Sequence, residues 1–186
     1  MDEAHKYYNY ELVKSQKEDQ KTNIHSLFYA NCGKNTQFNE LYIELIKNQI
    51  YPLFNEKIVY QAVPTFRVHL PNNLAVAEYH KDRDYFHNPH EVNFFLPLTK
   101  AFDSNTIWIE TYDNSNIYYP LEADYGEIII FDGANLNHGN KTNNTNKTRI
   151  SVDFRAMPLK YFEESSNISI SAGVSMKIGD YYSIYG

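Results

Sequence analysis

The chain has 186 residues, 42% of them hydrophobic and 22% charged, which suits one packed domain and argues against disorder. Its net charge of −6 disfavours a nucleic-acid partner, because phosphate contacts need a basic surface. No apolar run is long enough for a membrane span, the start is too polar for a secretory signal, and Cys32 alone excludes an internal disulfide. We therefore expect a cytoplasmic protein without membrane partners.

The first 56 residues are expected to form a helical lead-in that packs on the rest of the domain. Residues 1–34 are polar and predict only a short, partly ordered segment. Residues 36–51 place apolar side chains at i, i+3 and i+4 spacing, which is typical of a helix with one buried face. Thr36 suits the N-cap position, and Pro52 is expected to end this helix directly after Tyr51.

Residues 57–186 are predicted to form a β domain. Short segments rich in β-branched and aromatic residues lie at 57–63, 65–70, 74–80, 91–98, 105–112, 126–132 and 149–156. With no helices between them, they predict an all-β sandwich, barrel or double-sheet jelly roll. The polar stretch 139–148 suits a hairpin loop, and residues 160–186 are assigned to no element.

Three side chains in this domain form a candidate metal site. His80 and Asp82 are two residues apart, so in an extended segment both point to the same side. Such a pair alone is more often a surface contact than a metal site. His138 follows an apolar segment and a turn, which places it at a rim. Two imidazoles and one carboxylate are the facial triad of non-heme Fe(II) oxygenases, which leaves open positions on the iron.

A candidate anion site follows the last histidine of this set. Arg149 and Ser151 share one face of a predicted strand, and together they offer the donors that bind a carboxylate. The chain uses 13 Lys but only four Arg, and all four arginines lie in the β domain. This bias indicates that guanidinium geometry matters at these positions, which are Arg67, Arg83, Arg149 and Arg155.

The motif order H-x-D, a distant His and then R-x-S resembles the Fe(II)/2-oxoglutarate-dependent oxygenase superfamily, whose fold is the double-stranded β-helix, a jelly roll. The likeness covers roughly residues 60–186. It implies Fe(II) on His80, Asp82 and His138, with 2-oxoglutarate held by Arg149 and Ser151. It also implies that O₂ is consumed and that succinate and CO₂ are formed.

A narrower likeness concerns the substrate. Segments such as FRVHLPNN, YHKDRDYFHNPHEVNFFLPLT and TRISVDFRAMP are similar to small bacterial oxygenases found with streptomycin-type and surface-carbohydrate biosynthesis genes. This likeness implies hydroxylation of a sugar or a sugar-linked small molecule.

Other side chains have open roles. Asn93 either contacts the C1 carboxylate of 2-oxoglutarate or satisfies backbone groups of the barrel. Arg83, Tyr85 and His87 follow the H-x-D pair and are expected to line the substrate entrance, unless they are solvated loop residues. Arg67 suits either the pocket mouth or a structural ion pair, whereas a structural role is favoured for Arg155.

Two alternatives belong to other classes of protein. A cupin-like metal-dependent isomerase or epimerase shares the architecture, but it usually carries an H-x-H that this chain lacks. A non-enzymatic jelly-roll module that binds glycans is compatible with the aromatic content of 16%.

Overall fold

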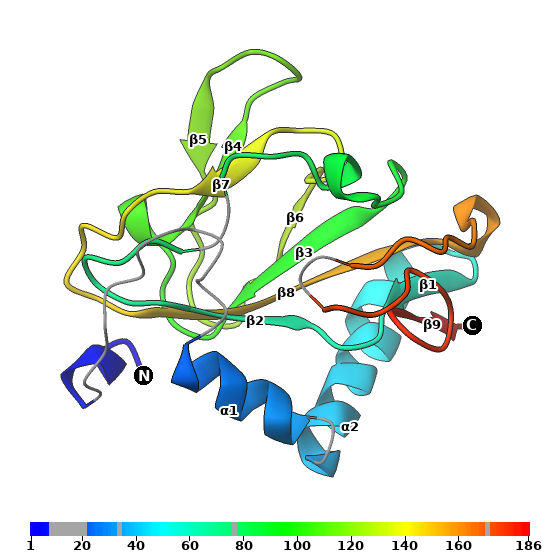
Figure 1. Ribbon diagram of the computed structural model, residues 1–186, viewed down its shortest axis with the longest axis horizontal. Coiled ribbons are helices and arrows are strands. Elements are labelled where there is room, and N and C mark those ends of the chain that lie inside the picture. The colour runs from blue at the N-terminus through cyan, green and yellow to red at the C-terminus, as the bar shows by residue number, and fades with distance from the viewer. Residues whose placement is uncertain (8–21, 33–34, 76–77, 170–171) are drawn as a thin grey trace.

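The computed structural model describes residues 1–7, 22–32, 35–75, 78–169 and 172–186. Within these ranges the chain is mainly β, with two α-helices beside two antiparallel sheets (Figure 1). The prediction of a mainly β fold is confirmed. The helices are α1 (Asn23–Cys32) and α2 (Thr36–Leu45), and the strands are β1 (Ile58–Gln61), β2 (Thr65–His69), β3 (Val92–Pro97), β4 (Ile107–Glu110), β5 (Tyr118–Pro120), β6 (Ile129–Phe131), β7 (His138–Asn140), β8 (Arg149–Pro158) and β9 (Tyr182–Tyr185). No helix among the described residues is long and apolar enough to cross a membrane.

The two sheets meet around the long strand β8. The larger sheet has the order β6-β3-β8-β1-β9, and β2 also pairs with β8, along the half of the strand that precedes the β1 pairing. The smaller sheet has the order β5-β4-β7. Figure 1 places the smaller sheet on one side of the larger one and the two helices on the other side.

The sequence of β8 explains why the layers assemble in this way. Successive side chains of a strand point to opposite faces. Phe154 and Ala156 point to the helical side and pack with Tyr42, Ile46 and Ile50 in one buried cluster. The other face of β8 is mostly polar and consists of Arg149, Ser151, Asp153, Arg155 and Met157.

The smaller sheet covers this polar face. A second apolar cluster joins Phe95 and Phe131 of the larger sheet to Ile107 and Ile109 of the smaller sheet. The polar row of β8 is therefore enclosed between two sheets, where burial makes each charge costly unless it is paired.

The helix predicted at 36–51 is longer and less regular than expected. Asn35, not Thr36, is the N-cap, and its side chain accepts a hydrogen bond of 3.0 Å from the Phe38 amide. The α-helix continues as a π-turn (η3, Ile46–Ile50) and a 3₁₀ turn (η4, Tyr51–Leu53) that contains Pro52. A proline is tolerated in the first turn of a helical segment, since its missing N–H has no partner there.

Helix α1 lies where the sequence predicted only a partly ordered lead-in. Of its ten residues only His25 and Cys32 are buried, so it has no apolar stripe to reveal it. The helix packs on β2, where the rings of Phe28 and Phe66 stack with centroids 4.2 Å apart. The part of the lead-in at 8–21 lies outside the described residues.

Two other predicted elements differ from the structure. The described part of 74–80 forms no strand, and only His80 makes an isolated bridge, to His138. β propensity depends on a paired neighbour, and the described part of this segment has one only at His80. Residues 139–148 are not a hairpin loop, because residues 139 and 140 belong to β7, and the rest connects β7 to β8 in a different sheet. Asn143 fixes this connection by donating to the carbonyl groups of His69 (3.1 Å) and Lys147 (2.8 Å).

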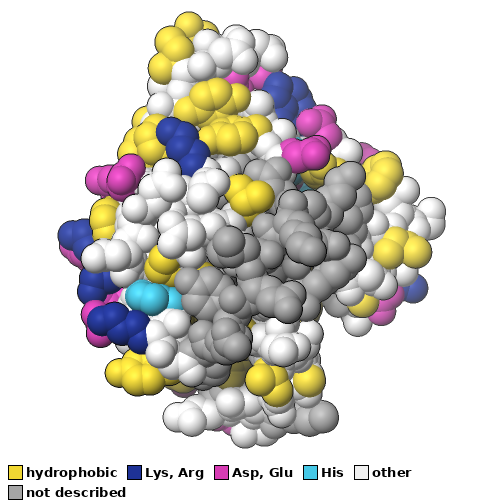
Figure 2. All heavy atoms as spheres, turned by 60° about the vertical axis from the view of Figure 1, so that its left-hand side comes forward, with side chains coloured by type: hydrophobic (Ala, Val, Ile, Leu, Met, Phe, Trp, Pro, Cys, Tyr) yellow, Lys and Arg dark blue, Asp and Glu magenta, His cyan; other side chains and the backbone are white. Residues whose placement is uncertain are grey.

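The start of the chain packs against the same connection. The amide of Thr148 donates to the carbonyl of Asp2 at 2.7 Å, and Lys147 pairs with the Asp2 carboxylate at 2.8 Å. Figure 2 shows acidic and basic side chains next to each other on this side of the molecule. These contacts hold the segment that leads into Arg149.

Two histidines, His25 and His69, are fully buried. The backbone amide of Val68 donates to His25 Nε2 at 3.3 Å, and His69 Nε2 lies 2.9 Å from the carbonyl oxygen of Asn73. Burial, aided by the positive charges of Arg67 and Arg149, lowers the pKa of His25 to about 4, and burial with the charge of Arg149 lowers that of His69 to about 3. Both imidazoles are therefore neutral in the folded protein near neutral pH.

These histidines predict loss of stability in mild acid. Unfolded histidine takes up a proton near pH 6.5, whereas the folded pKa values are depressed, so the unfolded state binds more protons as the pH falls below about 6.5. Each histidine then lowers the free energy of unfolding by about 1.4 kcal/mol per pH unit until its folded pKa is reached. Urea unfolding of metal-free protein at pH 7, 6 and 5 should show this slope. It should be shallower in His25→Gln and unchanged in the control His90→Gln, and an unchanged slope in His25→Gln would refute the assignment.

Candidate metal centre

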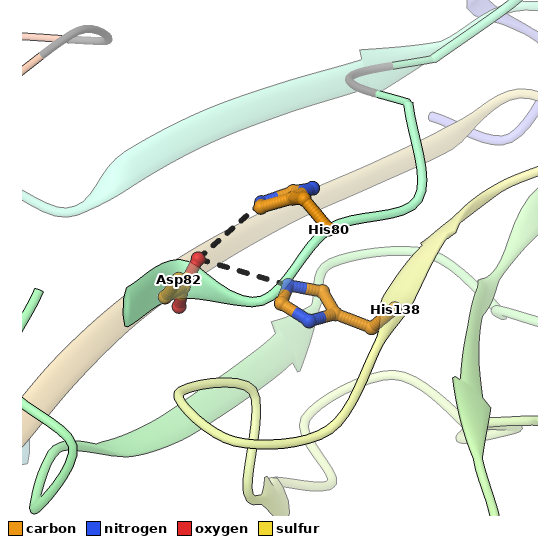
Figure 3. Close-up of side chains that lie close together, drawn as sticks. All are labelled: His80, Asp82 and His138. Atoms are coloured by element: carbon orange, nitrogen blue, oxygen red, sulfur yellow. Dashed lines mark ion pairs between the residues drawn. The ribbon is translucent and has the colours of Figure 1, made fainter. Parts of the chain in front are cut away.

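The structure brings His80, Asp82 and His138 together (Figure 3). His80 and His138 exchange two backbone hydrogen bonds of 3.0 and 2.9 Å, which fix their side chains beside each other. Asp82 opens a 3₁₀ turn (η5, Asp82–Tyr85), and its amide donates to the carbonyl of Gly133 at 2.9 Å. One ligand atom of each side chain lies within 4.8 Å of the others.

The imidazoles are oriented by backbone carbonyl groups. His80 Nδ1 lies 2.8 Å from the carbonyl oxygen of Glu78, and His138 Nδ1 lies 3.1 Å from that of Leu136. A carbonyl oxygen only accepts, so each Nδ1 carries the hydrogen. Burial lowers the pKa of His138 to about 4, against the opposing pull of Asp82, so this imidazole is neutral near pH 7. Its Nε2 lone pair therefore faces the carboxylate.

One carboxylate oxygen of Asp82 accepts hydrogen bonds from neighbouring side chains, and the other faces the two imidazoles. Its Oδ2 accepts hydrogen bonds of 2.7 Å from both Asn93 Nδ2 and Arg155 Nε. Its Oδ1 lies 3.4 Å from His80 Nε2 and 3.8 Å from His138 Nε2. Burial opposes ionisation, but the charge of Arg155, with smaller contributions from His80 and His138, outweighs it and holds the pKa of Asp82 well below its usual range.

A buried network supports Arg155 from behind. Its Nε lies 3.8 Å from Glu91 Oε2, and its Nη1 donates to the Tyr181 hydroxyl at 3.3 Å. Glu91 also contacts His87 Nδ1 at 2.9 Å and accepts a hydrogen bond from the Tyr182 hydroxyl. Tyr181 and Tyr182 of the C-terminal segment are thus linked to the Asp82 carboxylate, Tyr181 through Arg155 and Tyr182 through Glu91 and Arg155.

Arg149 and Ser151 lie next to each other on the inner face of β8. The guanidinium is 1% exposed and donates to Ser151 Oγ (2.6 Å), Asn140 Oδ1 (3.0 Å) and the carbonyl of Asn105 (2.9 Å). Its carbon atom lies 5.6 Å from the ring centre of Phe95. These contacts fix the direction in which the charged group points.

A narrow cleft connects this arginine to the histidines. Its cavity is about 40 Å³, which leaves room for an ion and small polar groups while larger molecules must extend beyond it. Three of the four arginines line it, in a protein whose net charge is −6. The wall consists of Arg67, His80, Asn93, Ile107, Phe131, His138, Gly139, Asn140, Arg149, Asp153 and Arg155.

The other predicted site residues lie in different surroundings. Arg67 Nε pairs with Asp153 at 2.9 Å on the cleft wall. Tyr85 packs its ring edge-on against His80, with centroids 5.1 Å apart. Arg83 donates to the Asn135 side chain at 3.3 Å, and His87 is buried against Glu91. Neither Arg83, Tyr85 nor His87 is part of the cleft wall among the described residues.

Asn93 lines the cleft, and its two amide atoms have different surroundings. Its Nδ2 is committed to Asp82, and its buried Oδ1 has no hydrogen-bond partner among the described residues. A carbonyl oxygen repels a carboxylate, so this geometry favours orientation of Asp82 over contact with an anionic ligand. The amide also fills the space beside Gly133, where a Cβ atom would lie 2.8 Å from Asn93 Cγ.

Sequence reasoning missed the partners of Asp82. Side chains two residues apart on a strand point to the same face, so Arg155 shares the inner face of β8 with Arg149, Ser151 and Asp153. Glu91 and the C-terminal tyrosines carry no such local signal, since their contacts depend on the pairing of distant segments.

A β-rich, cupin-like fold with a His–Asp–His cluster, in which Asp82 and His138 are buried and His80 is partly buried, is typical of metal-dependent biosynthetic enzymes. The chain belongs to the family of the streptomycin biosynthesis protein StrG of Streptomyces griseus, to which it is 39% identical over 171 residues, covering 91% of this chain and 80% of that protein. No family model matches the chain.

Two solved structures have a similar fold. They are the nickel complex and the apo form of the non-heme monooxygenase ThoJ, with TM-scores of 0.53 and 0.56 and identities of 13% and 10%. Each comparison covers 86% of this chain and 77% of the other. At these identities the likeness concerns the fold alone.

Proposed function

We propose that this protein is an Fe(II)- and 2-oxoglutarate-dependent dioxygenase on a double-stranded β-helix scaffold, which hydroxylates a small carbohydrate-related metabolite. The observation that carries the proposal is the convergence of His80 Nε2, Asp82 Oδ1 and His138 Nε2. Kinship with a streptomycin biosynthesis protein and a fold like that of a non-heme monooxygenase solved with nickel support it.

The three ligand atoms suit a divalent metal ion. Both Nδ1 atoms are engaged with carbonyl groups, so each imidazole turns its Nε2 atom toward the Asp82 carboxylate. A divalent cation lying between these three atoms would bind all of them. Two ligands of one ion are on the order of 3 Å apart, and the observed distances to Asp82 Oδ1 are 3.4 and 3.8 Å. A set of two histidines and one carboxylate is the donor set of non-heme Fe(II) oxygenases.

The inner face of β8 suits the cosubstrate. Iron with 2-oxoglutarate and O₂ would supply the oxidising chemistry, and succinate and CO₂ would be the products. Arg149 would bind the distal carboxylate of 2-oxoglutarate through its guanidinium, with the Ser151 hydroxyl as a further donor. Asn140 and the carbonyl of Asn105 hold this guanidinium in place, so little side-chain freedom would be lost on binding.

The prime substrate would lie mostly outside the narrow part of the cleft. A cavity of about 40 Å³ admits only its reacting group, and the rest of a sugar-sized molecule would extend past the mouth, where Tyr85 flanks His80. The assignment to carbohydrate chemistry rests on the kinship with StrG.

The test is an anaerobic titration of the protein with Fe(II) and 2-oxoglutarate, followed by visible spectroscopy. We expect a weak metal-to-ligand charge-transfer band that is absent in Asp82→Ala and Arg149→Ala. Metal binding without this band would exclude the dioxygenase and favour a cupin-like isomerase or epimerase. Glycan binding that survives His80→Ala, without any metal binding, would favour the non-enzymatic module.

The Arg149→Lys variant tests the cosubstrate site. A single ammonium cannot reproduce the planar fork of donors, so the affinity for 2-oxoglutarate should fall by about 10-fold to 100-fold, as expected for the loss of one charge-assisted hydrogen bond. Calorimetry with Fe(II)-loaded protein under argon measures this change. Arg83→Lys is the matched control, since Arg83 is exposed and its guanidinium donates to the Asn135 side chain. Normal binding by Arg149→Lys would move the cosubstrate assignment to another arginine of the cleft.

A further inference from the structure

A second hollow lies further along the inner face of β8. Met157 follows Arg155 by two residues, so both side chains point to the same side of the sheet. The cavity beyond Arg155 has a volume of about 310 Å³, within the range of small-molecule sites. It shares no wall residue with the cleft at the histidines among the described residues. We call it the Met157 cavity.

The floor of the Met157 cavity is apolar and aromatic. Met157, Met176 and Tyr182 are buried at 1%, 2% and 3% exposure, and the ring of Phe162 packs edge-on against Tyr182, with centroids 5.5 Å apart. Thioether sulfurs are polarisable, and aromatic faces carry partial negative charge. Such a floor accepts an apolar body and favours a cation near its rings.

Phe86 forms an exposed wall of this cavity. It ends the turn that Asp82 begins, and its backbone is in the left-handed region with φ 71°. A bulky residue adopts this conformation only at a cost, and here the ring is also 56% exposed. A ligand in the cavity would cover the Phe86 ring, and removing this apolar surface from water would favour binding.

The charged residues in the wall of the Met157 cavity are all acidic among the described residues. Glu163 and Glu164 line the cavity, and no Lys, Arg or His does so among the described residues. Neither carboxylate forms an ion pair or a side-chain hydrogen bond with another described residue. Two carboxylates beside a low-dielectric floor attract a cation more strongly than carboxylates in open water.

We propose that the Met157 cavity binds a small organic ammonium ion with an apolar body, of the arylalkylamine class. The ammonium group would lie at Glu163 and Glu164, and the apolar body would lie over Met157 and Met176 beside Phe86. This proposal does not depend on iron or 2-oxoglutarate, because the cavity and the metal cleft have separate walls.

The test uses 2-phenylethylammonium as the probe and methionine methyl groups as reporters. The chain has three methionines, so ¹³C-methyl labelling gives signals for Met157 and Met176 and an internal control at Met1. We expect the ammonium probe to shift the first two signals only. The neutral analogue 2-phenylethanol should bind at least tenfold more weakly, and 3-phenylpropionate should not bind.

Two sets of variants locate the charge and the wall. The double variant Glu163→Gln/Glu164→Gln should bind the amine and the alcohol equally. The control Glu40→Gln/Glu44→Gln changes the net charge by the same amount at two exposed positions of α2, and it should still bind the amine more tightly than the alcohol. Phe86→Ala should weaken the amine while the thermal midpoint stays unchanged, because the ring is exposed. Equal binding of amine and alcohol by the wild type, or no shift at Met157 and Met176, would overturn the proposal.

Discussion

Replacing His138 with alanine is expected to lower the affinity for Fe(II) by more than about 100-fold, because changes in the outer shell of a metal site alone cost about 10-fold to 100-fold. The fold should survive. The imidazole lines the cleft, and the backbone bonds of His138 to His80 do not need its side chain. The free energy of unfolding of metal-free protein should change by less than about 2 kcal/mol.

The measurement is a chelator competition for Fe(II) under argon, together with thermal unfolding with and without metal. Binding of metal to the folded state alone raises the midpoint of the wild type, and this increase should vanish in His138→Ala. His80→Ala should behave in the same way. The control His90→Ala removes an exposed imidazole that stacks on Tyr161 and should bind iron normally. Undiminished iron binding by His138→Ala would remove this residue from the metal site.

The triad was accessible to sequence reasoning because its signals are local. His80 and Asp82 are two residues apart, and His138 follows an apolar strand and a turn. The residues that hold Asp82 are not local: Arg155 is 73 residues away, and the Tyr182 hydroxyl reaches Glu91 across 91 residues. Only the pairing of β3 with β8, which sets Asn93 opposite Arg155, places these groups behind the triad.

The fold shows the same division between local and non-local information. Strands such as β3 and β8 carry β-branched and aromatic residues in a clear pattern, and the sequence predicted them. The segment 74–80 has a similar composition, but its described part pairs only at His80. Helix α1 lacks an apolar face that would mark it as a helix. The connection between β7 and β8 has the polarity of a hairpin loop, although it passes from one sheet to the other.

The Arg155→Met variant should have the largest effect on stability. Arg155 is 7% exposed, and its Nε donates to Asp82 Oδ2 at 2.7 Å and lies 3.8 Å from Glu91. Methionine fills much of the space but removes the charge, which leaves two buried carboxylates close together. Loss of one partner of a buried ion pair costs about 3–5 kcal/mol, because the remaining charge has been removed from water without compensation.

Urea unfolding of the metal-free protein at pH 7 measures this cost, and Arg83→Met is the control, because an exposed arginine should contribute less than about 1 kcal/mol. The double variant Arg155→Met/Asp82→Asn separates the charge effect from packing. Once Asp82 is neutral, the Arg155→Met change should be much less costly, so the two free-energy changes should not add. Additive changes, or a cost of Arg155→Met no greater than that of Arg83→Met, would show that Arg155 does not compensate the buried carboxylate. In that case Asn93 alone would fix the orientation of Asp82, and the metal site would depend on β3 rather than on the far end of β8.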